Sequence, residues 1–108
     1  MSKAQIVGWA HSKFGKSSAP DTEHLMAEVI APALEHAGVS AADIDGIFVG
    51  VMNNGFSKQD FQGALAGMAM PELGMTPAVR MENACATGSA ALYSAAAARL
   101  PSWSVPKR

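Results

Sequence analysis

The sequence predicts an α/β fold in which strands and helices alternate in the order β-α-β-α-β-α, and three observations point to it. Short apolar runs rich in strand-forming residues fall at 4–10, 44–52 and 77–83. Segments with helical patterns fall between and after them, at 22–37, 60–70 and 86–99. Glycine and proline mark the loops between these segments. The alternation implies parallel strands with right-handed crossovers, and therefore a mostly parallel sheet covered by helices.

The first strand is expected at residues 4–10, because Ile6, Val7 and Trp9 favour extended backbone. The segment HSKFGKSSAPD that follows is rich in residues that form turns. We therefore expect a strand that leads through a turn into the first helix.

The first helix has signals at both ends and along one face. Asp21 or Thr22 can cap its N-terminus, because a side-chain oxygen there accepts a hydrogen bond from a backbone N–H group without a partner. Apolar residues between positions 25 and 37 recur on one face. Gly38 suits the left-handed position that ends many helices. Pro32 lies inside and removes a hydrogen bond, so we expect it to kink or divide the helix.

The middle of the chain predicts a short turn, a strand and a loop. The segment SAADID indicates a single capped turn, with Ser40 three residues before Asp43. The run IDGIFVGVM is apolar with little alternation, which is typical of a strand covered on both faces. The segment NNG, residues 53–55, then marks a loop.

The second half of the chain predicts a helix, a strand and another helix. Residues 60–70 are expected to be helical, and we interpret the four-residue spacing of Gly63 and Gly67 as a site of close packing. Residues 77–83 are expected to form the third strand and residues 86–99 the third helix.

Length and composition indicate one domain or a piece of one. Of the 108 residues, 49% are hydrophobic and 16% are charged, which is more apolar than a free-standing domain of this size needs. We therefore expect the chain to form an oligomer or to be part of something larger. The fold is expected to occupy residues 1–98. The tail, residues 99–108, combines two prolines, a tryptophan and a basic end, and is not expected to belong to it.

Charge and cysteine content exclude several classes of protein. The net charge of -1 lacks the basic surplus of proteins that bind nucleic acid. No segment approaches about 20 strongly apolar residues, so no membrane span is expected. A single cysteine cannot form an internal disulfide, and the N-terminus lacks the apolar run of a secretory signal. A soluble cytoplasmic protein is the simplest interpretation.

Cys85 is the strongest candidate for a reactive group, and two interpretations of it stay open. On residue type alone, a lone cysteine is more often a buried structural thiol. Its position between the third strand and the third helix favours a nucleophile, because a helix N-terminus stabilises a thiolate and a sharp strand-to-helix turn exposes a side chain. The residues around it are small enough for close approach by a substrate or another backbone: Ala84, Ala86, Gly88, Ser89 and Ala90.

No other group has a comparable signal. His11, His24 and His36 lack the spacing of a metal site, and solvated or core positions account for them better than catalysis does. Three methionines at positions 68, 70 and 75 are more commonly core fillers than the lining of an acyl pocket. The sequence has no phosphate-binding glycine motif, so nucleotide-triphosphate chemistry is excluded. We expect no metal site and identify no cofactor-binding residues.

Three segments together resemble the N-terminal part of a thiolase. They are IVGWAHSKFGK, ALEHAGVSAADIDGIFVG and VRMENACATGSAALYSA, and the resemblance covers residues 5–98. The middle segment is moderately specific to the thiolase superfamily. The run NACATGSAAL is strongly specific, because it matches the family's nucleophile block. The most similar branches are the sterol-carrier-protein-x type and the acetyl-CoA acetyltransferase type.

The resemblance implies that Cys85 attacks an acyl-CoA and carries the acyl group as a thioester. It implies that the helix at 85–98 is a central buried helix between two similar halves. It also implies a dimer or tetramer that exchanges acyl groups between coenzyme A and a 3-ketoacyl-CoA. On this interpretation the coenzyme A thioester is a substrate, and no cofactor is permanently bound.

The family's remaining catalytic groups lie far downstream of the nucleophile, and no position in this chain matches them. They are the activating histidine, a second acid/base residue and the oxyanion-hole donors. We therefore expect a truncated or frame-shifted thiolase that is inactive alone. The alternative is a non-catalytic thiolase-like subunit that acts only by binding a partner. A β-ketoacyl synthase ranks lower, because the D-T-A-C-S-S type surround of its nucleophile is absent.

Overall fold

Two parallel strands, β1 (Ile47–Gly50) and β2 (Ala78–Met81), form the sheet in the computed structural model of the chain. Their register pairs Ile47 with Ala78 and Gly50 with Met81. The structure describes residues 3–54 and 57–98. The other elements are α1 (Thr22–Ala37), η1 (Ala41–Asp43), α2 (Gln62–Ala69), η2 (Pro71–Leu73) and α3 (Thr87–Ala97), where η denotes a 3-10 helix.

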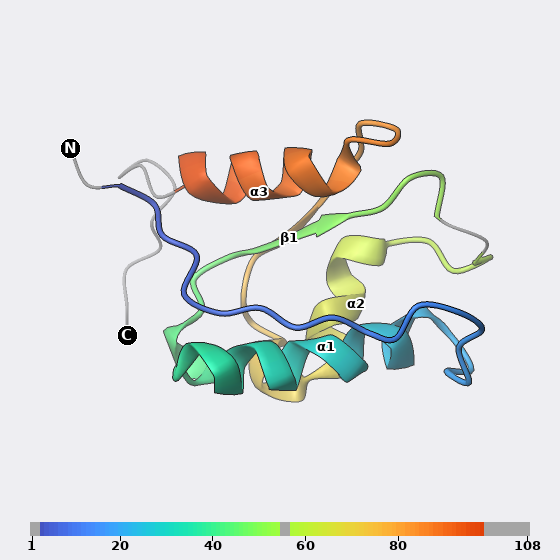
Figure 1. The fold of residues 1–108 in the computed structure, drawn as a ribbon, viewed down its shortest axis with the longest axis horizontal. Coiled ribbons are helices and arrows are strands. Elements are labelled where there is room, and N and C mark those ends of the chain that lie inside the picture. The colour runs from blue at the N-terminus through green and yellow to red at the C-terminus, as the bar shows by residue number, and fades with distance from the viewer. Residues whose placement is uncertain (1–2, 55–56, 99–108) are drawn as a thin grey trace.

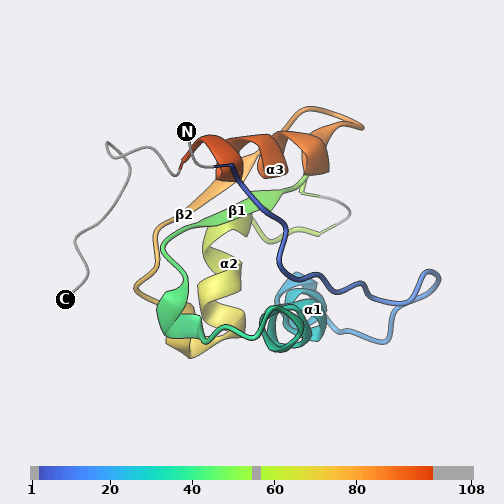
Figure 2. The ribbon, with the colours of Figure 1, turned by 60° about the vertical axis from the view of Figure 1, so that its left-hand side comes forward.

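The helices lie on both sides of the sheet (Figure 1). Helix α3 lies along one face, and α2 contacts both strands from the opposite face. Helix α1 packs on α2, away from the strands, as the turned view in Figure 2 also shows. The expected α/β arrangement, a parallel sheet covered by helices, is therefore confirmed. The strands β1 and β2 and the helices α2 and α3 lie within the ranges that the sequence predicts.

The core lies around α2. Leu65 and Ala66 of α2 are exposed by 3% and 4%, and Leu73 of η2 is exposed by 4%. These side chains are removed from water where α2 meets the strands and η2. The core of the described residues is small, as expected for a chain of this length.

The glycines of α2 permit the close packing that their spacing predicts. A Cβ atom added to Gly63 would lie 3.1 Å from the backbone nitrogen of Arg80, in β2. A Cβ atom added to Gly67 would lie 3.3 Å from the Cα atom of Gly74, which follows η2. The packing interpretation is confirmed, and the neighbours are a strand and a short helix end.

Helix α1 has the caps that the sequence predicts. Oδ1 of Asp21 accepts a hydrogen bond from the backbone N–H of His24 at 2.8 Å. Gly38 takes the left-handed conformation, with φ of 70°, and ends the helix. Pro32 lies inside α1, which is one continuous helix; a division of the helix is therefore ruled out, and the expected kink stays a prediction. Proline removes a single hydrogen bond, so the rest of the helix can form around it, and α1 packs on α2.

The capped turn after α1 is also confirmed. The backbone N–H of Ser40 donates to Oδ2 of Asp43 at 2.9 Å, and the backbone N–H of Asp43 donates to the carbonyl of Ser40 at 3.0 Å. This reciprocal pair closes η1 and directs the chain into β1.

The first strand expected at residues 4–10 is wrong. The backbone N–H of Trp9, which a sheet would use, donates to Nδ1 of His36 at 3.0 Å. A Cβ atom added to Gly8 would lie 2.6 Å from the Cβ of Ala37, so this segment runs against the end of α1. In the described residues the sheet therefore has two strands instead of three. Strand-forming residues need a neighbouring strand with which to pair, and residues 4–10 have a helix beside them.

The loop after β1 contains two asparagines in the left-handed conformation. Asn53 and Asn54 have φ values of 51° and 57°, which confirms the loop after β1; Gly55 lies outside the described residues. The tail, residues 99–108, also lies outside them, so the expectation about it stays a prediction. Within residues 3–54 and 57–98, no helix is both long and apolar enough to span a membrane.

Candidate active site

Cys85 lies on the turn between β2 and α3, beyond the carboxyl end of the strand. The residue is exposed, so the interpretation as a buried structural thiol is wrong. Helix α3 begins two residues later at Thr87, with Ala86 as its N-cap residue. The thiol therefore stands beside the first turn of α3, whose backbone N–H groups lack partners within the helix. A helix N-terminus is a favourable place for a negatively charged group.

The turn that carries Cys85, residues 83–87, has an unusual backbone. Ala84 has a φ of 45°, in the left-handed region that residues with a Cβ atom rarely adopt. Two backbone hydrogen bonds close the turn. The N–H of Ala86 donates to the carbonyl of Asn83 at 2.8 Å, and the N–H of Thr87 donates to the carbonyl of Ala84 at 3.2 Å. Cys85 thus sits at the apex of a tight, closed turn.

The Thr87 side chain adds two further hydrogen bonds to this turn. Its Oγ1 accepts from the backbone N–H of Asn83 at 2.9 Å and donates to the carbonyl of Ala84 at 2.6 Å. Thr87 is exposed by only 7% and is the buried residue of α3. A Cβ atom added to Gly50 would lie 2.8 Å from the carbonyl oxygen of Thr87, so the end of β1 packs directly on the start of α3.

Sequence analysis did not single out Thr87 or Gly50. A hydroxyl residue where the predicted helix begins was a usable signal, because threonine is a residue type that satisfies helix ends. The glycine at the end of the apolar run in β1 was a second signal, since it marks a close approach of backbone.

A cluster of charged and amide groups joins the residues that follow the two strands. We call it the strand-end cluster, and it comprises Asn53, Asn54, Asp60, Arg80 and Glu82. Arg80 donates from Nη2 to Oε1 of Glu82 at 3.1 Å and from Nη1 to Oδ1 of Asn54. Its Nη1 also lies 3.6 Å from Oδ1 of Asp60. The cluster fixes the loop after β1 against the end of β2, and its member Glu82 lies three residues before Cys85.

Glu82 accepts two of these contacts on a single oxygen. The backbone N–H of Asn53 donates to Oε1, the same atom that Arg80 contacts. The Asn53 hydrogen bond, followed by the contact with Arg80, lowers the pKa of Glu82 below its ordinary value of 4.5. The carboxylate is therefore charged under neutral conditions.

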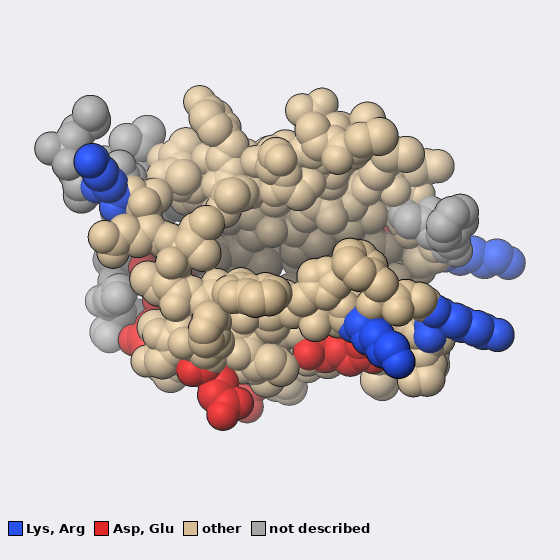
Figure 3. All heavy atoms as spheres, viewed as in Figure 1, with Lys and Arg blue, Asp and Glu red and all other residues tan. Residues whose placement is uncertain are grey.

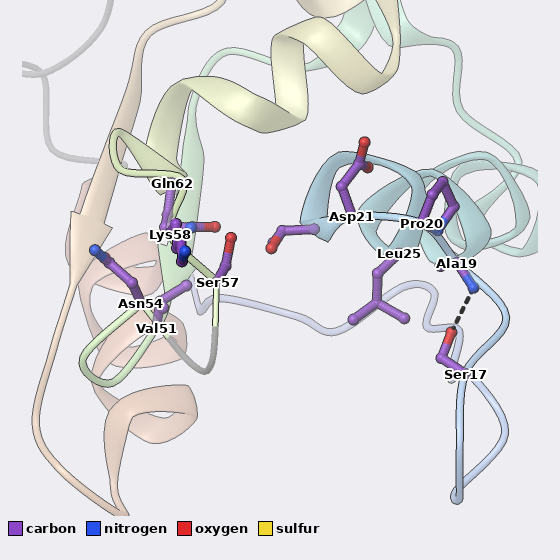
Figure 4. A pocket seen from close by; sticks show the side chains of 11 residues that line it. Ser17, Ala19, Pro20, Asp21, Leu25, Val51, Asn54, Ser57, Lys58 and Gln62 are labelled. Atoms are coloured by element: carbon purple, nitrogen blue, oxygen red, sulfur yellow. Dashed lines mark hydrogen bonds between the residues drawn. The ribbon is translucent and has the colours of Figure 1, made fainter.

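A cavity of about 590 Å³ lies at the same edge of the sheet, between the start of α1 and the segment after β1. Figure 4 shows Pro20 and Leu25 on one side of it, and Ser57, Lys58 and Gln62 on the other. Gln62 is fully buried; its Nε2 donates to the carbonyl of Gln59 at 2.5 Å, whereas its Oε1 has no hydrogen-bond partner. Cys85 does not line this cavity, so the thiol stands on an open turn.

The three histidines make their contacts away from Cys85. Nδ1 of His24 lies 2.7 Å from Oδ1 of Asp21; this contact raises the pKa of His24, and the hydrogen bonds from His24 lower the pKa of Asp21. His36 accepts from Trp9, and the His11 ring lies edge-on to Phe14 with 4.5 Å between centroids. The structure therefore brings no histidine to the described surroundings of Cys85.

Two of the three methionines at positions 68, 70 and 75 lie at the surface of the described residues. Met68 and Met75 are exposed by 60% and 91%, so the interpretation as core fillers is wrong for these two, whereas Met70 is half-buried. Met68 lies on α2 and lines a small hollow with Asp21 at the start of α1, whereas Met75 follows η2. In the part of the chain that the structure describes, no three His, Cys, Asp or Glu side chains come together in a way that could hold a metal ion.

Helix α3 is an outer helix in this chain. Leu92 and Tyr93 are exposed by 57% and 78%. The helix contains no charged residue, and Figure 3 shows the uncharged surface over it. In the described residues, α3 contacts the strands on one side, and Leu92 lines a hollow together with Ala4 and Ile6 of the N-terminal segment. The burial between two similar halves that the resemblance implies stays a prediction.

Comparisons with known proteins agree with this arrangement. A family model described as the thiolase N-terminal domain matches residues 4–99. The acetyl-CoA acetyltransferase of Methanothermobacter thermautotrophicus is 34% identical over 97 residues, which cover 87% of this chain and 24% of the relative. That of Methanocaldococcus jannaschii is 35% identical over 98 residues, with 88% and 24% covered. The chain thus spans about a quarter of the length of these curated relatives.

Proposed function

Because this chain belongs to the thiolase N-terminal domain family, we propose that it serves thiolase-type acyl transfer on acyl-CoA thioesters. The observation that carries the proposal is the exposed Cys85 on the turn between β2 and α3. Both relatives are named acetyl-CoA acetyltransferases, which supports an acetyl group as the simplest acyl group to transfer.

Cys85 is the nucleophile in this proposal. Its thiolate attacks the carbonyl carbon of the acyl-CoA, and a bond forms between Sγ and that carbon. The bond between the carbonyl carbon and the coenzyme A sulfur breaks, and coenzyme A leaves as a thiolate. The acyl group remains on Cys85 as a thioester, and a second acceptor later removes it. The step needs no permanently bound cofactor, and acyl-CoA is the partner in the sense of a substrate.

Acid–base groups for turnover have to come from elsewhere in an assembled thiolase. His24 and His36 are engaged with Asp21 and Trp9, and neither contacts the turn that carries Cys85. Each missing acid or base lowers the rate by about 10²–10⁴-fold. We therefore propose that Cys85 works in this way only within an oligomer or beside a further thiolase polypeptide. A cytoplasmic location suits this chemistry, because a reducing compartment keeps the thiol free.

A second candidate function is a non-catalytic thiolase-like subunit that acts by binding a partner. The observation that favours it is the uncharged outer face of α3, with Leu92 and Tyr93 exposed. On this alternative, Cys85 forms no acyl adduct, and the chain's role depends on what covers that face.

Incubation of the purified chain with acetyl-CoA or acetoacetyl-CoA, followed by peptide mass spectrometry, distinguishes the two candidates. The proposal expects an adduct on Cys85 that hydroxylamine removes, since thioesters are labile to it. Cys85→Ser is the matched control and should carry no labile adduct at that position. The measurement is repeated with a full-length thiolase present. No adduct on Cys85 under either condition contradicts the acyl-transfer proposal and favours the binding role.

A further inference from the structure

The turn that presents Cys85 depends on a strained residue. Ala84 immediately precedes Cys85 and has a φ of 45°. A residue with a Cβ atom leaves this conformation unless surrounding contacts hold it there. The backbone of Ala84 sets the direction in which the chain enters Cys85, so whatever holds Ala84 also orients the thiol.

The hydroxyl group of Thr87 connects the two peptide groups on either side of this strained stretch. Oγ1 accepts a hydrogen bond from the backbone N–H of Asn83, which belongs to the peptide group that links Glu82 to Asn83. The same oxygen donates a hydrogen bond to the carbonyl of Ala84, which belongs to the peptide group that links Ala84 to Cys85. Both contacts use one oxygen atom, at 2.9 Å and 2.6 Å. A single side chain thus bridges the two peptides, in addition to the backbone hydrogen bonds that close the turn.

The Thr87 side chain is itself held in place by packing. It is exposed by only 7%, and its Cγ2 lies where a Cβ atom on Gly50 would approach to 2.9 Å. Glycine at position 50 makes room for the methyl group against β1. With the methyl group packed there, the hydroxyl group is directed into the 83–87 turn.

We infer that Thr87 is a positioning residue for Cys85: its hydroxyl group holds Ala84 in the left-handed conformation, and its methyl group fixes that hydroxyl against β1. The inference rests on the proposed function, because the presentation of Cys85 matters for acyl transfer only if Cys85 is the nucleophile. It adds to that function a residue that touches neither the substrate nor the reacting sulfur.

Alkylation of Cys85 tests the inference, since it is the chain's one cysteine. The rate constant with iodoacetamide is measured for the native full chain and divided by that of the same chain unfolded in urea. A thiol held beside a helix N-terminus reacts faster than one in an unfolded chain, so the wild-type ratio should exceed one. Thr87→Val keeps the shape of the side chain and lacks the hydroxyl group. Its ratio of native to unfolded rate constants should be closer to one than that of the wild type by about two- to tenfold, because one hydrogen bond changes the population of the ordered turn by about that factor. Thr87→Ser keeps the hydroxyl and should retain most of the wild-type ratio.

A second variant separates positioning from general stability. Glycine adopts positive φ without strain, so in an Ala84→Gly background the Thr87→Val change should have a clearly smaller effect. Equal effects of Thr87→Val in both backgrounds overturn the inference, as does a wild-type ratio of one. If Thr87→Val alone fails to fold, the double variant is used. A double variant that also fails to fold overturns the inference, because Thr87 would then act on stability in general.

The two proposals fail independently, because alkylation requires no coenzyme A. An alkylation rate that depends on Thr87, together with no acyl adduct on Cys85, rejects the proposed function and leaves the inference about the turn. An acyl adduct on Cys85, together with an alkylation rate that is indifferent to Thr87, rejects the inference alone.

Discussion

The backbone N–H of Asn53 donates a hydrogen bond to Oε1 of Glu82, and this contact joins the residues that follow the two parallel strands. Arg80 donates to the same oxygen at 3.1 Å. One carboxylate therefore connects the loop after β1 to the segment that leads into the Cys85 turn. The edge of the sheet at which the proposed nucleophile lies is thus held together by these polar contacts as well as by the packing of Gly50 on Thr87.

Glu82→Gln should flatten the acid dependence of stability. The pKa of Glu82 is lowered chiefly by the Asn53 N–H, so its carboxylate contributes stability that is present above the ordinary value of 4.5. That contribution is lost as the pH falls through the lower pKa of the folded state. Glutamine keeps an acceptor oxygen without the charge, so this part of the pH dependence should disappear. Thermal unfolding of both chains between about pH 2 and pH 7 measures it, and identical acid profiles contradict the prediction.

The Asp21–His24 contact should give the start of α1 a stability plateau in mildly acidic solution. The pKa of His24 is raised by Asp21, so its contribution is present below the ordinary value of 6.5 and is lost as the pH rises through the folded-state pKa. The pKa of Asp21 is lowered by His24, so its contribution is present above 3.8 and is lost as the pH falls through its own folded-state pKa. Both contributions are complete between these ordinary values.

His24→Ala and Asp21→Asn separate the two sides of this plateau. His24→Ala should remove the loss of stability on the alkaline side of the plateau. Asp21→Asn keeps an oxygen at the N-cap and should remove the loss of stability on both the alkaline and the acidic side. The measurement is the melting temperature by circular dichroism across the pH range. A His24→Ala chain that still loses stability on the alkaline side as the wild type does would count against the pairing.

Alanine at the two glycines Gly63 and Gly88 should have opposite effects on stability. At Gly63 the added Cβ meets the backbone of β2 at 3.1 Å, so Gly63→Ala should destabilise the fold by about 1–3 kcal/mol through overpacking. At Gly88, in the first turn of α3, the added Cβ meets nothing within 4 Å, so Gly88→Ala should stabilise it by up to about 1 kcal/mol. Urea unfolding of both variants provides the comparison. Equal effects at the two positions would refute the packing of α2 on β2.

The parts of the fold that depend on neighbouring residues in sequence were predictable. Asp21 and Gly38 define the ends of α1 because their hydrogen bonds are made within a few residues. The strand predicted at residues 4–10 was not formed, because a strand is completed by its neighbour. Trp9 favours extended backbone whatever lies beside it, and in this structure its neighbour is His36 of α1 instead of a strand.

In the candidate site, too, features set by local sequence were predictable and features set by distant residues were not. The position of Cys85 between a strand and a helix followed from local patterns and is confirmed, whereas its chemical role stays a prediction. The contact of Gly50 with Thr87 joins positions far apart in the chain: a glycine within an apolar run indicates a close approach of backbone, and no local pattern identifies its partner. The left-handed backbone of Ala84 was equally hidden, because alanine itself disfavours that conformation.

The contact between Gly50 and Thr87 restricts which substitutions evolution can accept at position 50. A Cβ atom at position 50 would meet the backbone oxygen of Thr87 at 2.8 Å, and no smaller side chain at position 87 relieves a collision with backbone. A lineage that replaces Gly50 would have to shift the whole of α3, and Cys85 with it. Position 50 therefore has no compensating partner, and descendants that keep this turn should keep a glycine there.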